Sequence, residues 1–132
     1  MKRLLLFSLF LIIGFIAEGQ YSIQNTKPDT LFDNILIKKI SSDKQQTHFM
    51  IWVKKSVPCH YHAHHTESIV VLKGRAEMYI DSTTFKIKKG DMLTIPENHA
   101  HGVNKVLSKR PLTILSIQSP EFDGSDRIFG KP

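Results

Sequence analysis

Short runs in which apolar and polar residues alternate follow one another along most of the chain, and turn-forming residues separate them. The runs are rich in β-branched and aromatic residues and recur roughly every 8–12 residues, a spacing typical of antiparallel sandwiches and barrels. No run after residue 20 shows the helical period of 3.6 residues. We therefore predict an all-β fold. The expected strands are residues 35–40, 47–53, 68–72, 75–80, 83–87, 92–95, 103–107 and 112–117.

The first 19 residues have a different pattern. A basic start (MKR) precedes an almost wholly apolar stretch, residues 4–17, and small residues follow at Ala17 and Gly19. This order is typical of a secretory signal peptide cleaved before Gln20. The alternative is an uncleaved membrane anchor, but the stretch is shorter than the about 20 residues that span a bilayer. We predict an exported protein, periplasmic or secreted, with no membrane attachment after cleavage.

Composition limits what the remaining chain can be. With 41% hydrophobic and 23% charged residues, the chain is of ordinary globular composition and neither disordered nor fibrous. Its length of 132 residues predicts a single domain over residues 20–132, with the strand-forming part at about 31–118 and a C-terminal strap over 119–132. The net charge of +6 comes from scattered lysines rather than a basic stripe, so we expect no nucleic-acid partner.

Two strand faces and the single cysteine bear on packing. Within 47–53, Met50 and Trp52 share one face, while Phe49 and Ile51 share the other. Both faces are apolar, which is more than one small barrel interior needs, so we predict that the outer face is covered in a homodimer. The pattern does not say which face lines the interior. Cys59, the only cysteine, allows no internal disulfide and is expected to face away from its neighbour His60.

The histidines are concentrated rather than scattered. Six of the seven lie in two windows, residues 60–65 and 99–101, and only His48 lies outside them. In an extended strand residues i and i+2 point to one face, so His60 and His62 project together. Imidazoles combined with a carboxylate are the mixed ligands that a divalent transition metal takes. A single histidine is more often solvated or hydrogen-bonded in a core, and we accept that interpretation for His48.

Two motifs in these windows resemble those of the cupin superfamily. The first is His60-x-His62-x4-Glu67-x6-Gly74, and the second is Gly90-x5-Pro96-x4-His101-x2-Asn104. Asn98 stands where the family usually has glycine, and Asn also reaches left-handed backbone. The interval to Asn104 is one residue shorter than the usual pattern. The likeness extends over about residues 31–118.

The resemblance implies a small antiparallel jelly-roll β-barrel of cupin type. It also implies a metal held by His60, His62, Glu67 and His101. Because His62 and His64 also form an i, i+2 pair, spacing alone leaves His64 as a competing ligand. We keep the family set and interpret three further histidines as loop residues, namely His64, His65 and His99.

The resemblance leaves the activity open between two classes. One is a metalloenzyme acting on a small molecule, a dioxygenase or an isomerase or epimerase, in which Glu67 is the candidate catalytic base. The other is a non-catalytic exported protein that binds a small ligand or only the metal. Fe, Mn, Ni, Cu and Zn all suit the ligand set. A second acidic or tyrosyl residue in the pocket would favour the enzyme, whereas an apolar lining would suit O2 chemistry or passive binding.

Overall fold

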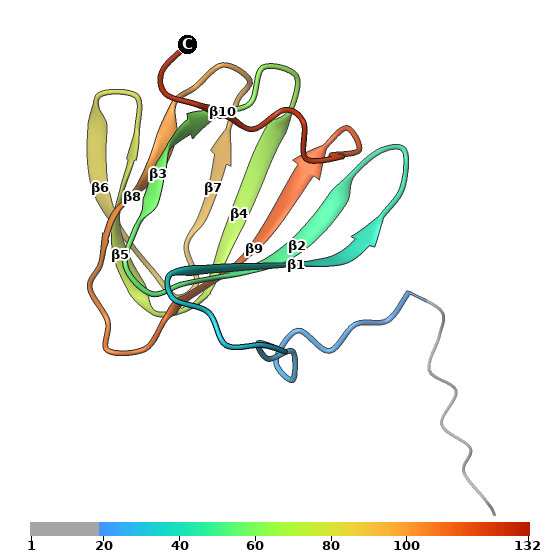
Figure 1. Ribbon diagram of the computed structural model, residues 1–132, viewed down its shortest axis with the longest axis vertical. Coiled ribbons are helices and arrows are strands. Elements are labelled where there is room, and N and C mark those ends of the chain that lie inside the picture. Colours follow the sequence, from blue (N-terminus) through green and yellow to red (C-terminus); the bar gives the residue numbers. More distant parts are fainter. Residues whose placement is uncertain (1–18) are drawn as a thin grey trace, which may run out of the picture.

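The computed structural model describes residues 19–132, which form two antiparallel β-sheets facing each other (Figure 1). The first sheet has the strand order β1-β2-β9-β4-β7, and the second has the order β10-β3-β8-β5-β6. The strands are β1 (Ile35–Ser42), β2 (Thr47–Val53), β3 (Val57–Tyr61), β4 (Thr66–Lys73), β5 (Arg75–Ile80), β6 (Thr83–Lys88), β7 (Met92–Ile95), β8 (His101–Val106), β9 (Leu112–Ser119) and β10 (Ile128–Phe129).

The all-β prediction is confirmed, since residues 19–132 contain ten strands and no helix. Each of the eight expected strands is present, with ends within two residues of the predicted ones. The sequence pattern did not give the two ends of β3, and it did not predict β10. The predicted signal peptide, residues 1–19, lies outside the described residues except for Gly19. No helix within the described range is long and apolar enough to cross a membrane.

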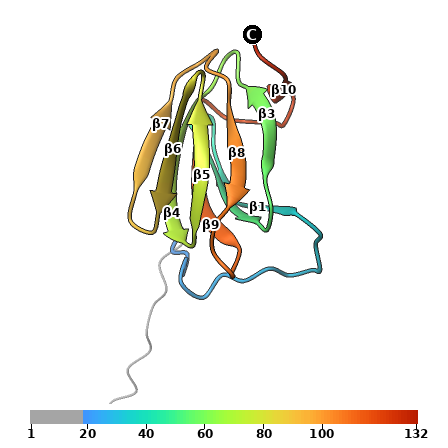
Figure 2. The same cartoon turned by 90° about the vertical axis from the view of Figure 1, so that its left-hand side faces the viewer.

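The core lies between the two sheets and follows from the alternation of each strand. Inward positions of β2 carry Phe49, Ile51 and Val53, and these pack against inward residues of β4 and β9. Strands β5, β6 and β8 close the other side, as the second view shows (Figure 2). The sequence did not show which face of β2 lines the interior. The structure shows that the odd-numbered residues of this strand point inward.

The outer face of β2 is covered by the chain itself. Met50 and Trp52 are buried although they point away from the core. The segment 19–33 lies along this face, where Ile23 and Thr26 share a surface hollow with Met50, and Pro28 shares one with Trp52. The apolar face that suggested a homodimer therefore has a cover within the same chain. The homodimer stays a prediction, and this face no longer supports it.

The C-terminal strap crosses the open end of the barrel. After β9 it runs over the ends of the strands and adds the short β10 to the edge of β3, where Ile128 pairs with Tyr61 (Figure 1). Within the strap, Phe122 is buried in the core cluster. Phe129 is 68% exposed.

Gly74, the last residue of the first motif, provides a test of this fold. It has φ +88°, and a Cβ there would lie 2.9 Å from the Leu112 Cα atom. Gly90 also has a positive φ, +95°, but has open space around it. Positive φ costs a non-glycine residue about 1–3 kcal/mol, and forced overpacking adds about 1–3 kcal/mol. We therefore expect Gly74→Ala to lose about 1–3 kcal/mol more unfolding free energy than Gly90→Ala, measured by urea denaturation. Equal losses of unfolding free energy in the two variants would contradict the close approach of Gly74 to Leu112.

Candidate metal centre

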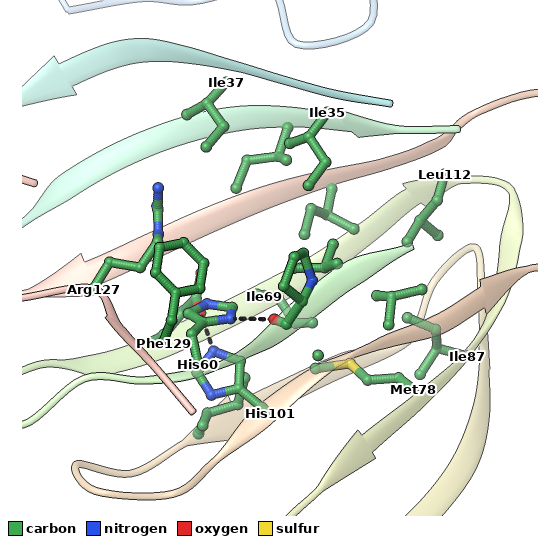
Figure 3. A pocket seen from close by; sticks show the side chains of 18 residues that line it. Ile35, Ile37, His60, Ile69, Met78, Ile87, His101, Leu112, Arg127 and Phe129 are labelled. Carbon is green, nitrogen blue, oxygen red and sulfur yellow. Dashed lines mark hydrogen bonds and ion pairs between the residues drawn. The ribbon is translucent and has the colours of Figure 1, made fainter. Parts of the chain in front are cut away.

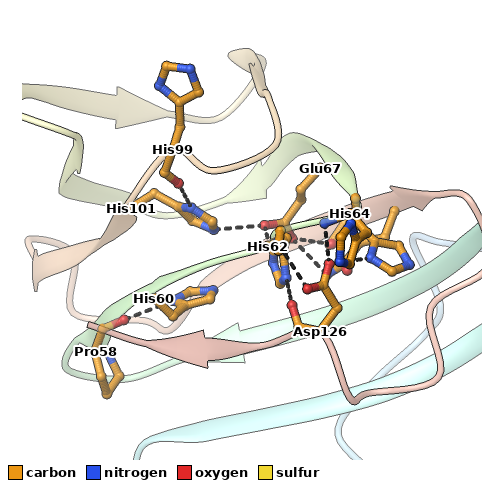
Figure 4. Close-up of polar contacts among 12 residues, drawn as sticks. Pro58, His60, His62, His64, Glu67, His99, His101 and Asp126 are labelled. Carbon is orange, nitrogen blue, oxygen red and sulfur yellow. Dashed lines mark hydrogen bonds and ion pairs between the residues drawn. The ribbon is translucent and has the colours of Figure 1, made fainter. Parts of the chain in front are cut away.

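Four side chains from three neighbouring segments converge inside the barrel, at the end that the strap covers (Figure 4). His60 comes from the end of β3, His62 from the residue after that strand, Glu67 from the start of β4 and His101 from the start of β8. The Cα atoms of His60 and His101 are paired across β3 and β8. Each of the four residues is at most 7% exposed. The predicted ligand set is therefore brought together by the fold.

Backbone carbonyl groups fix the orientation of all three imidazoles. The Nδ1 atom of His60 lies 2.9 Å from the Pro58 oxygen, that of His62 lies 2.5 Å from the Asp126 oxygen, and that of His101 lies 2.9 Å from the His99 oxygen. A carbonyl oxygen only accepts hydrogen bonds, so each Nδ1 must carry the proton. In the neutral rings the three Nε2 atoms are then left with lone pairs. This is the arrangement in which metal-binding histidines are usually held.

Glu67 is oriented from the opposite side by β9. Ser116 donates a hydrogen bond to its Oε1 atom, and the Gln118 amide nitrogen lies 3.5 Å from the same oxygen. The other oxygen, Oε2, lies 3.1 Å from Nε2 of His101 and 3.6 Å from Nε2 of His62. One carboxylate oxygen is thus turned toward the histidines.

The ligand atoms of the cluster are arranged around a point that suits a positive charge. A lone pair of His101 facing a carboxylate oxygen at 3.1 Å is repulsive unless a proton or a metal ion lies between them. The Nε2 atom of His62 is buried and has no hydrogen-bond partner within the described chain, a costly state for a polar atom. The four ligand atoms lie within 4.8 Å of one another. Since ligands on opposite sides of an ion at 2.0–2.3 Å are about 4–4.6 Å apart, the residues fit a divalent transition metal.

Protonation favours the same conclusion. Burial and the neighbouring His101 lower the pKa of His60 to about 4, so its ring is neutral and can donate to a metal at neutral pH. Burial alone would raise the pKa of Glu67, but the hydrogen bonds and charge of His101, His62 and Ser116 outweigh it and hold that pKa well below its usual range. His60 therefore presents a neutral imidazole and Glu67 a carboxylate.

A cavity of about 170 Å³ opens directly onto this cluster (Figure 3). His60, Glu67 and His101 form part of its wall, so an ion held by the cluster would face the cavity. The rest of the wall is almost wholly Ile, Val, Leu and Met side chains from both sheets, joined at one end by Arg127 and Phe129 of the strap. The site can therefore hold a small molecule next to a metal ion.

Comparison with known protein families agrees with the motifs and the geometry. The family model described as the cupin domain matches residues 47–118, which include all four cluster residues. The chain belongs to the cupin superfamily. The two facing antiparallel sheets are then those of a cupin jelly roll. Asn98, at the usual glycine position of the second cupin motif, has φ 62°, as its left-handed propensity predicted.

One curated relative and several solved structures also resemble this chain. An uncharacterized protein of Aquifex aeolicus is 31% identical over 96 residues, covering 73% of this cupin and 78% of the relative. A double-stranded β-helix protein of Klebsiella pneumoniae has a TM-score of 0.74 at 15% identity, covering 91% of this chain and all of its own. An RmlC-like cupin of Shewanella frigidimarina has a TM-score of 0.66 at 16% identity, covering 81% and 95%. At such identities the structures show the fold alone.

The remaining histidines of this cupin lie outside the cluster, although not all in the predicted manner. His64 is exposed, and His99 binds Asp81 on the surface at 2.6 Å, pointing away from the cluster (Figure 4). His48 lies 2.7 Å from the Ser41 hydroxyl, a satisfied polar contact as expected. His65, interpreted as an open loop residue, is only 8% exposed. Its loop position is correct, but its side chain is buried against the strap.

Cys59 points away from His60, as the strand alternation predicted. It lies on the outer side of β3, partly exposed, and its Sγ atom is 3.4 Å from the Gly130 oxygen of the strap. The thiol therefore contributes packing and a weak hydrogen bond outside the metal centre.

Asp126 was missed by the sequence reading and organises the loop that carries His62. Its carboxylate accepts hydrogen bonds from the backbone N–H groups of Ala63 and His64 and from His65 Nδ1 at 2.5 Å, while its own carbonyl holds His62. Burial opposes its ionisation, but these donors lower its pKa to about 2. The same ion pair raises the pKa of His65 against the effect of burial. The strap thus fixes one candidate metal ligand from 64 residues away in sequence.

We expect Asp126→Ala to weaken metal binding about 10–100-fold, the usual loss when a group that orients a ligand is removed. Without the carboxylate, the loop over residues 63–65 loses three hydrogen bonds to the strap. The backbone carbonyl that accepts from His62 remains, but the strap and the loop are then no longer fixed relative to each other. The measurement is zinc affinity by competition with a chromophoric chelator. Asp123→Ala is the matched control, because Asp123 lies in the same strap, is exposed and bonds only to Ser125. Equal affinity in the two variants would contradict this role.

Proposed function

We propose that this cupin binds one divalent transition metal through His60, His62, Glu67 and His101 and presents it to a small organic molecule in the adjacent cavity. The observation that carries the proposal is the arrangement of three Nε2 atoms and one carboxylate oxygen around a common centre, with three of these residues in the cavity wall. When bound, such a metal supplies Lewis acidity or O2 binding.

The cavity lining favours O2-dependent oxidation over isomerisation or epimerisation. Those proton-transfer reactions need an acid or base within reach of the substrate. Among residues 19–132, Glu67 is the one carboxylate side chain in the wall, and the wall contains no Tyr or Lys. Glu67 itself is 5% exposed and is engaged through both oxygens, so a ligand role suits it better than that of a mobile base. We therefore propose a dioxygenase acting on a small, largely apolar molecule.

The residues of the chain perform the supporting steps. The aliphatic wall excludes water and holds the hydrocarbon part of the substrate, while the carbonyl-anchored histidines keep their Nε2 atoms directed at the centre. Ser116 and Gln118 keep the Glu67 carboxylate in place. Preorganisation of this kind lowers the reorganisation that a reaction would otherwise require.

A metal analysis followed by an oxygen-electrode screen tests the proposal. Protein purified without a histidine tag is expected to contain about one metal ion per chain, and to consume O2 with at least one member of a panel of small phenols and diketones. Sugars serve as polar comparison substrates that the apolar cavity should not accept. Conversion of a substrate to an isomer without O2 consumption would contradict the dioxygenase proposal.

The same lining also supports a second candidate, a non-catalytic protein that binds its ligand through the metal. An apolar cavity with no acid or base other than the ligands suits passive binding as well as it suits O2 chemistry. Micromolar binding of a panel compound together with unchanged compound and unchanged O2 after prolonged incubation would favour this candidate.

A further inference from the structure

The cavity next to the metal centre has two chemically different ends (Figure 3). One end carries His60 and His101 together with Arg127 and Phe129 of the strap. The other end is formed by apolar side chains such as Met78, Ile87 and Leu112. A molecule that fills the cavity therefore meets polar and charged groups at one end and hydrocarbon at the other.

Arg127 is the one cationic side chain, histidines aside, in the described part of this wall. Within residues 19–132 it forms no ion pair, since no carboxylate lies within 4 Å of its guanidinium. Its guanidinium carbon stands 5.6 Å from the centroid of the Phe122 ring, a cation–π contact that places the head group. The preceding residue, Asp126, is fixed by the hydrogen bonds of the strap. A positioned, half-buried guanidinium without a counter-ion is a ready partner for an anion.

We propose that the ligand of this cavity is an amphipathic monocarboxylate whose carboxylate pairs with Arg127 and whose hydrocarbon body fills the apolar end. The inference rests on the proposed function, of which it names the substrate class. A planar guanidinium matches a carboxylate through two parallel hydrogen bonds. A phosphate would need further donors, and the wall offers no second Arg or Lys among the described residues.

The size of the cavity sets the size of the hydrocarbon body. An apolar protein cavity of about 150 Å³ holds a benzene molecule, and this cavity measures about 170 Å³. We therefore expect a body of about five to seven carbon atoms. Metal binding should strengthen the interaction, because a divalent ion adds two positive charges beside the cavity.

Calorimetric titration of the zinc-loaded protein tests the head group. Zinc is the metal used because it has no redox chemistry and leaves the probe unchanged. Hexanoate is expected to bind at least about tenfold more tightly than hexanamide, its neutral counterpart, and hexylammonium should not bind measurably. Arg127→Gln should abolish the preference for hexanoate over hexanamide, and Arg127→Lys should keep part of it. Lys131→Gln is the matched control, an exposed basic residue of the same strap outside the cavity wall.

A chain-length series tests the body. From butanoate upward each added methylene should raise affinity about fourfold, as burial of one CH₂ does, until the cavity is full and affinity falls. Ile35→Phe, which adds bulk at the cavity wall, should move the optimum to a shorter acid. Thermal unfolding of each variant verifies that it is folded.

Several outcomes would overturn the inference. One is equal binding of hexanoate and hexanamide, and another is a hexanoate preference that survives Arg127→Gln in folded protein. The third is that no acid binds at 10 mM, a concentration on the order of the dissociation constants of the weakest specific complexes. Metal content measured on the same samples separates this from the proposed function. If the protein retains no metal but prefers hexanoate over hexanamide through Arg127, the inference is supported and the proposed function is refuted. If the protein retains metal but shows no preference for hexanoate, the inference is refuted and metal binding is supported.

Discussion

Replacing His62 with alanine is expected to remove most of the metal from the purified protein while leaving the barrel folded. The Nε2 atom of His62 is fully buried and has no hydrogen-bond partner within the described chain, and its Nδ1 proton is already committed to the backbone oxygen of Asp126. Loss of a group that merely orients a ligand costs about 10–100-fold in metal affinity, so loss of the ligand should cost more than about 100-fold. Metal content by inductively coupled plasma mass spectrometry and zinc affinity by chelator competition are the measurements.

His64→Ala is the matched control, because this histidine is two residues away and exposed. It should keep its metal. His65 is less suitable as a control than its spacing suggested, since its ring holds the strap through Asp126 and Glu121. If His64→Ala lost metal and His101→Ala kept it, the cupin ligand set would be wrong and the site would be a local histidine cluster on one loop.

The parts of this structure that depend on local pattern could be predicted from sequence. Strand positions follow from alternation and turn residues, both of which act over a few neighbours. Three of the four candidate metal ligands lie within eight residues, and the fourth, His101, was supplied by the family motif that ends at Asn104. Asn98 could be placed in left-handed backbone from its side chain alone.

The parts that depend on distant contacts could not be predicted in the same way. Asp126 contacts residues more than 60 positions earlier in the chain, and no spacing rule connects them. The sequence contains a weak indication that Ser116 and Gln118 contact the site. They are polar residues at inward positions of a largely apolar strand, which pairs with the strand of Glu67. The cover on the outer face of β2 was misjudged for a similar reason, since the segment 19–33 has no strand pattern.

Phe122→Ala is expected to destabilise the protein by about 3–5 kcal/mol, the usual cost of deleting a buried aromatic ring. The Phe122 ring is 3% exposed and packs edge-on against three others, with centroid distances of 6.0 Å to Phe49, 5.4 Å to His62 and 5.0 Å to His65. Its removal empties the junction between the strap, the core and the loop that carries a metal ligand.

Phe129→Ala is the matched control for this variant, because it removes the same side chain from the same strap at a position that is 68% exposed. Its loss in urea unfolding should stay within about 0.5 kcal/mol, as for most surface substitutions. Zinc affinity should also fall in Phe122→Ala, because Phe122 packs against His62. Equal stabilities of the two variants would show that the strap is not anchored through Phe122. A large stability loss with unchanged zinc affinity would show that the backbone carbonyl of Asp126 orients His62 without the support of that ring.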